Sequence, residues 1–481
     1  MSDTIQRRTV LKAAGFAAAG IAGSAIAAGR KRKFVNVGTG SRSRMYLTAV
    51  TKTFAESNEL VAICDTNPGR LDVAAAFVAP NLSTSGAKPK KYLAADFDRM
   101  IKETKPDCVI VTTPDAFHDE YIVRALDAGC DCITEKPLTT TPAKAQRILD
   151  ACKRNNRHVR VLFNYRYSPP RTQIKDMLMA GAIGDVMSVD FHWLLNTSHG
   201  ADYFRRWHSQ KEISGGLMVH KATHHFDLVN WWLGSEPELV QAYGKKEFYT
   251  PKMARRMGLD SHHERCKTCP EKSKCTFYLD IDADKNFKTL YSDNEKHDGY
   301  FRDRCVWRPD INIEDTMNVI VKYRTGATLS YSLNAFNAWE GYTIAFNGTK
   351  GRIEHRIVEG GQVSAGAANY QGEDNDAIST YLIPLRGKPQ KQEVWTGTGG
   401  HGGGDNVMLT ELFGTPADDK YKRAADERSG FYSILIGAAA NQCFEHGNAV
   451  KIAELVNGLT SPVFAPMPTR DSPVPMPPGK V

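Results

Sequence analysis

The chain has 481 residues, of which 41% are apolar and 24% are charged, proportions typical of a soluble globular protein with two or three domains. Its net charge of +8 is concentrated near the N-terminus, because residues 1–27 contribute +2 and residues 30–33 contribute +4, which leaves +2 for the rest. That remainder forms no basic helix or stripe, which excludes nucleic-acid binding as a function.

The N-terminus is typical of an export signal. Adjacent Arg7 and Arg8 precede residues 13–28, which are small, weakly apolar and too short to span a bilayer stably. The arginine pair and the Ala-Ile-Ala sequence at 25–27 predict the twin-arginine route, which exports folded proteins. We therefore expect residues 1–33 to be a signal peptide and basic linker, the twin-arginine machinery to be a partner, and the protein to be periplasmic or otherwise exported through this route. A basic N-terminus retained in the cytoplasm is the alternative.

After this linker, short apolar runs alternate with helical stretches, and no segment approaches a membrane span. Buried strands are expected at 33–38, 60–65, 107–114 and 131–137. Strands that alternate with helices predict an α/β domain with a doubly wound parallel sheet, the Rossmann architecture, over residues 34–155.

The sequence pattern changes after this domain. Residues 316–336 alternate apolar and polar side chains around a Thr-Gly turn, which predicts an antiparallel hairpin. We expect an open-faced, mostly antiparallel α+β domain over residues 156–460, with a polar, cysteine-containing insertion at about 245–310. Residues 461–481 are rich in proline and are expected to lie extended on the surface.

The first strand leads into a glycine-rich turn. Gly38 and Gly40 permit a tight turn and the close approach of a pyrophosphate, and the next helix offers free N–H groups. Ser43 stands where the dinucleotide motif has its third glycine. Asp65 ends the second strand, where a carboxylate binds the ribose hydroxyls and repels a 2′-phosphate. The pattern predicts an NAD site rather than an NADP site, and an ordinary glycine turn with a solvated aspartate is the alternative.

Candidate catalytic residues follow later strands. Lys136 comes directly after a strand, at the sheet end where ligands bind in this architecture. His220 and His224 are four residues apart, so on a helix they share a face, which Asp227 continues. Two histidines at this spacing can bind a metal, but the glutamate of the His-Glu-x-x-His motif is missing. Core or surface roles for these side chains are the alternative.

With these motifs the chain resembles the Gfo/Idh/MocA oxidoreductases. The likeness extends in order over about residues 34–350 and rests on VGTGSRS, CD, TTPDAFH, EKP and the segment from Gly215 to Asp227. It implies a Rossmann domain followed by an open-faced sheet domain. It also implies an enzyme that oxidises or reduces a sugar or cyclitol hydroxyl with a nicotinamide cofactor.

By this likeness Lys136 is the catalytic lysine, His224 is the acid/base histidine and His118 lies near the nicotinamide ribose. The family usually has an aspartate where this chain has His220, so we count His220 as a third catalytic candidate. Histidine can accept the hydroxyl proton as hydride leaves, and a partly desolvated lysine can donate to the developing alkoxide. The expected cofactor-binding residues are Gly38, Gly40, Ser41, Arg42, Ser43, Asp65, Thr113, His118, Glu135, Lys136 and Asn164.

Two stretches are suited to bind a carbohydrate. Residues 199–208 and 163–169 combine polar and aromatic side chains, which match the hydroxyls and the apolar faces of a sugar. A structural loop with exposed arginines is the alternative. The expected substrate-binding residues are Tyr165, Arg166, Tyr203, Arg205, Arg206 and His208.

Four of the ten cysteines form a group in the insertion. Cys266, Cys269 and Cys275 are followed by Cys305, a pattern that predicts a tetrahedral zinc site. Two disulfides, which an oxidising compartment permits, and an iron–sulfur cluster are the alternatives.

An exported nicotinamide enzyme has no cytoplasmic pool to replenish its cofactor. It must hold NAD tightly and return it to its starting state in each turnover. Two kinds of relative are similar in this respect: enzymes that couple oxidation of one sugar to reduction of another, and NAD-dependent glycoside hydrolases. We expect an exported, homo-oligomeric oxidoreductase of a sugar, glycoside or cyclitol. A glycoside hydrolase, a dehydrogenase with an external electron acceptor and a non-catalytic carbohydrate-binding protein remain alternatives.

Overall fold

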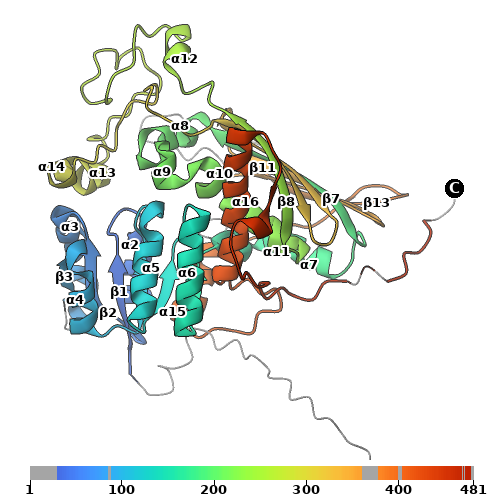
Figure 1. Cartoon of the computed structure of the whole chain (residues 1–481), viewed down its shortest axis with the longest axis horizontal. Coiled ribbons are helices and arrows are strands. Elements are labelled where there is room, and N and C mark those ends of the chain that lie inside the picture. Colours follow the sequence, from blue (N-terminus) through green and yellow to red (C-terminus); the bar gives the residue numbers. More distant parts are fainter. Residues whose placement is uncertain are drawn as a thin grey trace, which may run out of the picture.

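The structure, a computed structural model, describes residues 30–84, 88–359, 377–398, 403–468, 470 and 472–477. The expected export signal, with Arg7 and Arg8, lies outside these described residues. The described chain folds into two domains, each built around one sheet (Figure 1).

The N-terminal domain is a parallel six-stranded sheet in the order β3-β2-β1-β4-β5-β6. The strands are β1 (Arg32–Val37), β2 (Asn58–Asp65), β3 (Lys90–Leu93), β4 (Cys108–Val111), β5 (Asp131–Thr134) and β6 (Val159–Val161). The helices are α2 (Ser43–Thr48), α3 (Pro68–Val78), α4 (Phe97–Thr104), α5 (His118–Asp127) and α6 (Pro142–Asn155). The strand order reverses between β1 and β4, so a ligand crevice is expected at their carboxyl ends.

Both faces of this sheet are covered. Val35 and Val37 pack into one apolar core and Phe34 into another, because successive strand residues point to opposite faces. Because both faces are buried, the strands are nearly continuous runs of apolar residues. β1 begins at Arg32, which is buried and donates to the carbonyl oxygen of Leu412 at 3.2 Å. Part of the expected basic linker therefore belongs to the folded domain.

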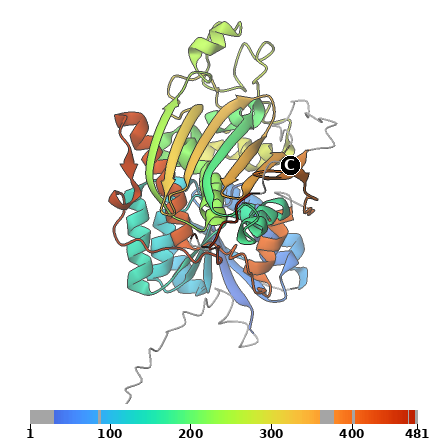
Figure 2. The ribbon, with the colours of Figure 1, turned by 90° about the vertical axis from the view of Figure 1, so that its right-hand side faces the viewer.

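The C-terminal domain is a nine-stranded mixed sheet in the order β14-β13-β12-β11-β7-β10-β9-β8-β15. Its strands are β7 (Val186–Asn196), β8 (Pro237–Lys245), β9 (Thr316–Tyr323), β10 (Thr328–Asn337), β11 (Gly341–Gly348), β12 (Gly351–Val358), β13 (Ile378–Pro384), β14 (Gln390–Lys391) and β15 (Val450–Lys451). β7 and β10 pair in parallel, and the other described neighbours are antiparallel. Buried and exposed side chains alternate along β9, and Figure 2 shows the sheet's open face. The predicted fold class is confirmed.

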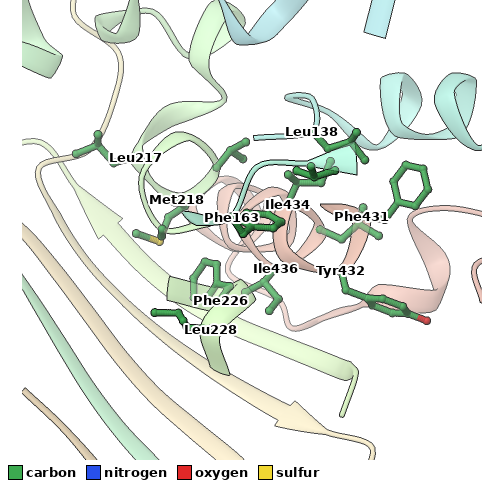
Figure 3. Close-up of a cluster of buried hydrophobic side chains, with 14 of the residues drawn as sticks. Leu138, Phe163, Leu217, Met218, Phe226, Leu228, Phe431, Tyr432, Ile434 and Ile436 are labelled. Carbon is green, nitrogen blue, oxygen red and sulfur yellow. The ribbon is translucent and has the colours of Figure 1, made fainter. Parts of the chain in front are cut away.

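Helices pack on the other face of this sheet and join it to the N-terminal domain. They are α7 (Pro169–Met179), α8 (Thr197–Arg205), α9 (Lys211–Ser214), α10 (Gly216–His220), α11 (Thr223–Leu233) and α16 (Glu427–His446). α15 (Gly404–Phe413) instead packs against the N-terminal domain, where Leu412 and Phe413 join the same apolar core as Phe34. In Figure 3, apolar side chains of α16 meet those of α10 and α11 and also Leu138 and Phe163 of the N-terminal domain. A Cβ at Gly437 would lie 2.4 Å from the Met218 carbonyl oxygen, so glycine lets α16 approach α10 closely.

The segment between β8 and β9 projects beyond the sheet and then lies over the N-terminal domain (Figure 1). It carries α12 (Pro251–Arg256), α13 (Lys285–Leu290) and α14 (Glu295–Asp298), and α13 contacts α3. In the part of the chain that the structure describes, no helix combines the length and apolarity that a membrane span needs.

Candidate active site

A cavity of about 990 Å³ lies between the two domains. Its walls come from the glycine-rich turn, the carboxyl ends of β2, β4 and β5, the helices α8 to α11, and the segment between β8 and β9. It is large enough for a dinucleotide site joined to a small-molecule site. The predicted site residues that line it are Gly38, Gly40, Ser41, Arg42, Asp65, Thr113, His118, Glu135, Lys136, Asn164, Tyr165, Tyr203, Arg206, His208, His220 and His224.

Two predicted substrate-binding residues lie elsewhere, which corrects the prediction. Arg166 is buried in a paired contact with Asp227, with N–O distances of 2.7 and 2.6 Å. Arg205 points to the cysteine group, where it donates to Cys266 Sγ at 3.2 Å and to the carbonyl oxygen of Phe277. Both guanidinium groups have structural partners and do not line the cavity.

The glycine-rich turn has the geometry of a phosphate cradle. Gly38 has a φ of +84°, and a Cβ there would lie 2.6 Å from the Thr112 carbonyl oxygen, so only glycine fits. Ser43 begins α2 below the turn and donates from Oγ to the Gly40 carbonyl oxygen at 2.7 Å. The serine at the third motif position therefore braces the turn instead of lining the cavity. The residues present fit a bound NAD.

Asp65 is fixed by neighbours from the segments that follow β1 and β2. Its carboxylate accepts from the Thr39 backbone N–H at 2.6 Å and from the Asn67 backbone N–H at 2.9 Å. Arg70 contacts the same carboxylate at 3.1 Å. The carboxylate is thus held at the end of β2, where a ribose-binding residue is required.

Glu135 organises the residues that follow β5. It accepts from the Arg42 guanidinium and from the Tyr46 hydroxyl. Burial raises the pKa of Glu135, but the Arg42 and Lys136 charges and the Tyr46 hydrogen bond together outweigh burial and hold the pKa below its ordinary value. His118 is buried, with its ring nitrogens 2.7 Å from the Pro137 carbonyl oxygen and 3.0 Å from that of Thr113. His118 therefore joins the ends of β4 and β5 at the cavity wall.

Lys136 is partly buried in the cavity wall. Burial lowers its pKa to about 8, although the carboxylates of Asp115 and Glu135 raise it. Its Nζ donates to the His220 carbonyl oxygen at 3.2 Å, which joins the ends of the two domains. A lysine with this pKa is charged at neutral pH yet can lose its proton readily.

His220 has a carboxylate partner that sequence reasoning missed. Its Nδ1 lies 2.5 Å from Oδ2 of Asp115, and both side chains are buried. Burial raises the pKa of Asp115 and lowers that of His220, so the pair holds one proton between the two atoms. The carboxylate that the family usually carries at position 220 is thus supplied by Asp115 from the N-terminal domain. Asp115 lies within the TTPDAFH motif at residues 112–118, and that motif was the sequence signal for its role.

His224 also lines the cavity, but not on one continuous helix with His220. α10 ends at His220 and α11 begins at Thr223, so the predicted shared helix face is wrong. The His224 ring stacks on Tyr165, with 4.3 Å between ring centroids. Asp227, which was expected to continue the face, turns away from the cavity to Arg166.

The four cysteines of the insertion line a separate, small cavity, together with His263. All ten cysteines are free, so the structure contains no disulfide, which was one alternative to the predicted zinc site. Among the described residues, the one group of three or more metal-ligand atoms within 4.8 Å of one another is His158, Asp426 and Glu427. The sulfur atoms therefore surround one cavity without the spacing of a tetrahedral metal site.

The fold and the cavity define a nicotinamide-dependent oxidoreductase with a Rossmann domain, and sequence comparison agrees. Residues 32–163 match the family described as "Oxidoreductase family, NAD-binding Rossmann fold", and residues 175–452 match its "C-terminal alpha/beta domain". The chain belongs to the Gfo/Idh/MocA oxidoreductase family, as the sequence motifs indicated. The predicted NAD-binding domain and enzyme class are confirmed.

Individual curated proteins and a solved structure are similar to this chain. YteT of Bacillus subtilis, whose name describes it as an oxidoreductase, is 38% identical over 416 residues, which cover 84% of this chain and 94% of YteT. D-glucoside 3-dehydrogenase of Escherichia coli is 30% identical over 132 residues, covering 27% of this chain and 34% of that enzyme. The aldose-aldose oxidoreductase of Caulobacter crescentus, solved with glycerol, shares the fold with a TM-score of 0.56 and 17% identity, over 88% and 100% of the two chains.

Proposed function

We propose that this protein is an exported oxidoreductase that uses tightly bound NAD(H) on a hydroxyl of a sugar, glycoside or cyclitol. One observation carries the proposal: Lys136, His220 and His224 face the same cavity as the glycine-rich turn and Asp65. Polar and aromatic groups suited to a sugar, among them Tyr203 and His208, line that cavity too. The dehydrogenase activity of the E. coli relative on a D-glucoside supports a substrate of this class.

Bound NAD supplies the acceptor and donor of hydride. His224 accepts the hydroxyl proton as the substrate is oxidised, and Tyr165 stacks on its ring and keeps it in the cavity. The Lys136 ammonium stabilises the negative charge that develops on the substrate oxygen. Asp115 orients His220 through Nδ1, which leaves the other ring nitrogen for a second proton transfer.

Substitution of the two proposed catalytic residues tests this function. Lys136→Ala and His224→Ala should each lower turnover by about a hundredfold or more, the usual effect of losing a positioned proton-transfer group. NAD binding should change only modestly, because the turn at Gly38 and the Asp65 carboxylate remain. Turnover that survives both substitutions would contradict the assignment.

A second candidate function is NAD-dependent glycoside hydrolysis, in which a sugar hydroxyl is oxidised, the aglycone is eliminated, water adds and the ketone is reduced. The Asp115–His220 pair favours it, because elimination needs an acid or base besides His224. A combined His220→Asp and Asp115→Asn variant returns the carboxylate to position 220. In a hydrolase this variant should slow aglycone release more than reduction of bound NAD, and equal effects would favour the plain oxidoreductase.

Export through the twin-arginine route is part of the same proposal. The Arg7-Arg8 pair supports it, and a folded enzyme can carry its NAD through that route. Fractionation of the native host should place the mature protein in the periplasm, and replacement of both arginines by lysine should retain the protein in the cytoplasm.

We also propose that Cys266, Cys269, Cys275 and Cys305 hold a structural zinc. The four residues surround one cavity, and the Cys269 backbone N–H donates to the Cys266 carbonyl oxygen at 3.0 Å in a tight turn. The thiol side chains must rotate toward one another for this ligation. Elemental analysis should find about one zinc per chain, and Cys269→Ser should lose it. An intact mass four hydrogens below that of the reduced chain would show two disulfides instead.

A further inference from the structure

The segment from α13 to Arg302 lies against the residues that hold the dinucleotide. The Ser41 backbone N–H, in the glycine-rich turn, donates to the Tyr291 hydroxyl at 3.1 Å. A Cβ at Gly40 would lie 3.7 Å from the same hydroxyl oxygen. Tyr291 therefore stands directly opposite the part of the turn that receives a pyrophosphate.

The same segment closes the ribose side of the crevice. Asp298 pairs with Arg70 at 2.6 Å, and Arg70 also contacts Asp65, so the insertion is linked to the ribose-binding carboxylate. Asn67 donates from Nδ2 to the carbonyl oxygen of Asn294 at 3.0 Å. These contacts place the insertion against the loop that follows β2.

A partly buried ion-pair network joins the other end of this segment to the C-terminal domain. Arg302 forms two contacts with Asp202 of α8, at 2.5 and 2.9 Å, and Arg206 contacts the same carboxylate at 2.8 Å. Two arginines on one aspartate leave a net positive charge, and both guanidinium groups line the main cavity with Tyr291 and Tyr300. The Arg206 Nε is buried and has no hydrogen-bond partner among the described residues. This surplus positive charge favours an anionic ligand in the adjacent space.

We propose that residues 285–302 form the outer wall of the dinucleotide site and set the rate at which NAD(H) leaves it. Tyr291 covers the pyrophosphate, the Asp298–Arg70 pair closes the ribose side, and Arg206 and Arg302 add positive charge opposite the glycine-rich turn. The wall contacts both domains, so bound cofactor escapes only when these contacts break. This inference rests on the proposed tight binding of NAD(H) and assigns that property to a segment outside the Rossmann domain.

The test measures NADH release from the full chain. Protein stripped of dinucleotide is reloaded with NADH, and the decay of NADH fluorescence is followed after a chase with excess NAD. Tyr291→Ala should raise the dissociation rate by about tenfold or more, and Asp298→Asn should raise it by a smaller factor. Asp293→Asn is the matched control, because Asp293 lies on the same segment but pairs with Lys288 on the exposed side.

The outcomes separate this inference from the proposed function. Faster release from both wall variants but not from the control supports the wall. Release rates within about twofold of the control in both variants overturn it, while NADH binding itself would still agree with the proposed enzyme. Failure of every form, wild type included, to bind NADH would refute the wall together with the proposed function.

Discussion

Titration of Lys136 should appear directly in the pH dependence of the enzyme. Burial lowers the pKa of Lys136 to about 8, and the proposed role requires its charged form. With that pKa, about 90% of the side chain is charged at pH 7 and about 10% at pH 9, whereas an ordinary lysine stays almost fully charged at both. We therefore expect kcat/KM to fall about tenfold between pH 7 and pH 9.

Two variants test whether Lys136 causes this fall in kcat/KM, the alkaline limb of the pH profile. Lys136→Arg keeps the charge at every accessible pH, so its residual activity should lack the limb. Asp115→Asn removes a carboxylate that raises the pKa of Lys136, so the limb should move to lower pH. Steady-state rates from pH 6 to pH 10, with saturating bound NAD, measure both effects. A flat wild-type profile, or a limb that persists unchanged in Lys136→Arg, would refute the reasoning.

Two further predictions concern selectivity and stability. Asp65→Ala should weaken NAD binding and relax discrimination against NADP, because the repelling carboxylate is gone while Arg70 remains; calorimetric titration with both cofactors checks this, and unchanged affinities would show that the ribose assignment is wrong. Burial lowers the pKa of Lys175, which donates to the Trp231 carbonyl oxygen at 2.7 Å, to about 7. Because this folded-state pKa lies below the unfolded value, the free energy of unfolding should rise by up to about 5 kcal/mol from pH 7 to pH 10.5 through this group. Lys175→Met should remove that rise in urea titrations, and an equal pH slope in the variant would contradict the burial argument.

The parts of the site that were predicted from sequence lie at the ends of strands. Gly38, Asp65 and Lys136 each follow a short apolar run, and parallel strands carry their carboxyl ends to one edge. The apolar runs and the predicted parallel sheet were therefore enough to predict that these residues lie close together. The mostly antiparallel sheet of the second domain was also predicted, because alternating apolar and polar residues along a strand indicate that one face of the sheet is buried.

The sequence predictions that were wrong or incomplete concern contacts between distant segments and the directions in which neighbouring side chains point. The tight turn from Asn164 to Tyr167 puts Tyr165 in the cavity but turns its neighbour Arg166 to Asp227. Arg205 and Arg206 diverge in the same way at the end of α8. The Asp115–His220 contact joins two domains, and no periodicity encodes such a pairing.

The most direct test of the proposed function follows bound NAD during a reaction. Protein purified from the periplasm, with no NAD added, is mixed with free sugars and aryl glycosides while absorbance at 340 nm is recorded. We predict that a substrate raises the absorbance by no more than one NADH per chain and that this NADH stays with the protein through gel filtration. No absorbance change with any compound, and no dinucleotide released when the protein is denatured, would contradict an enzyme that carries and recycles its own NAD(H).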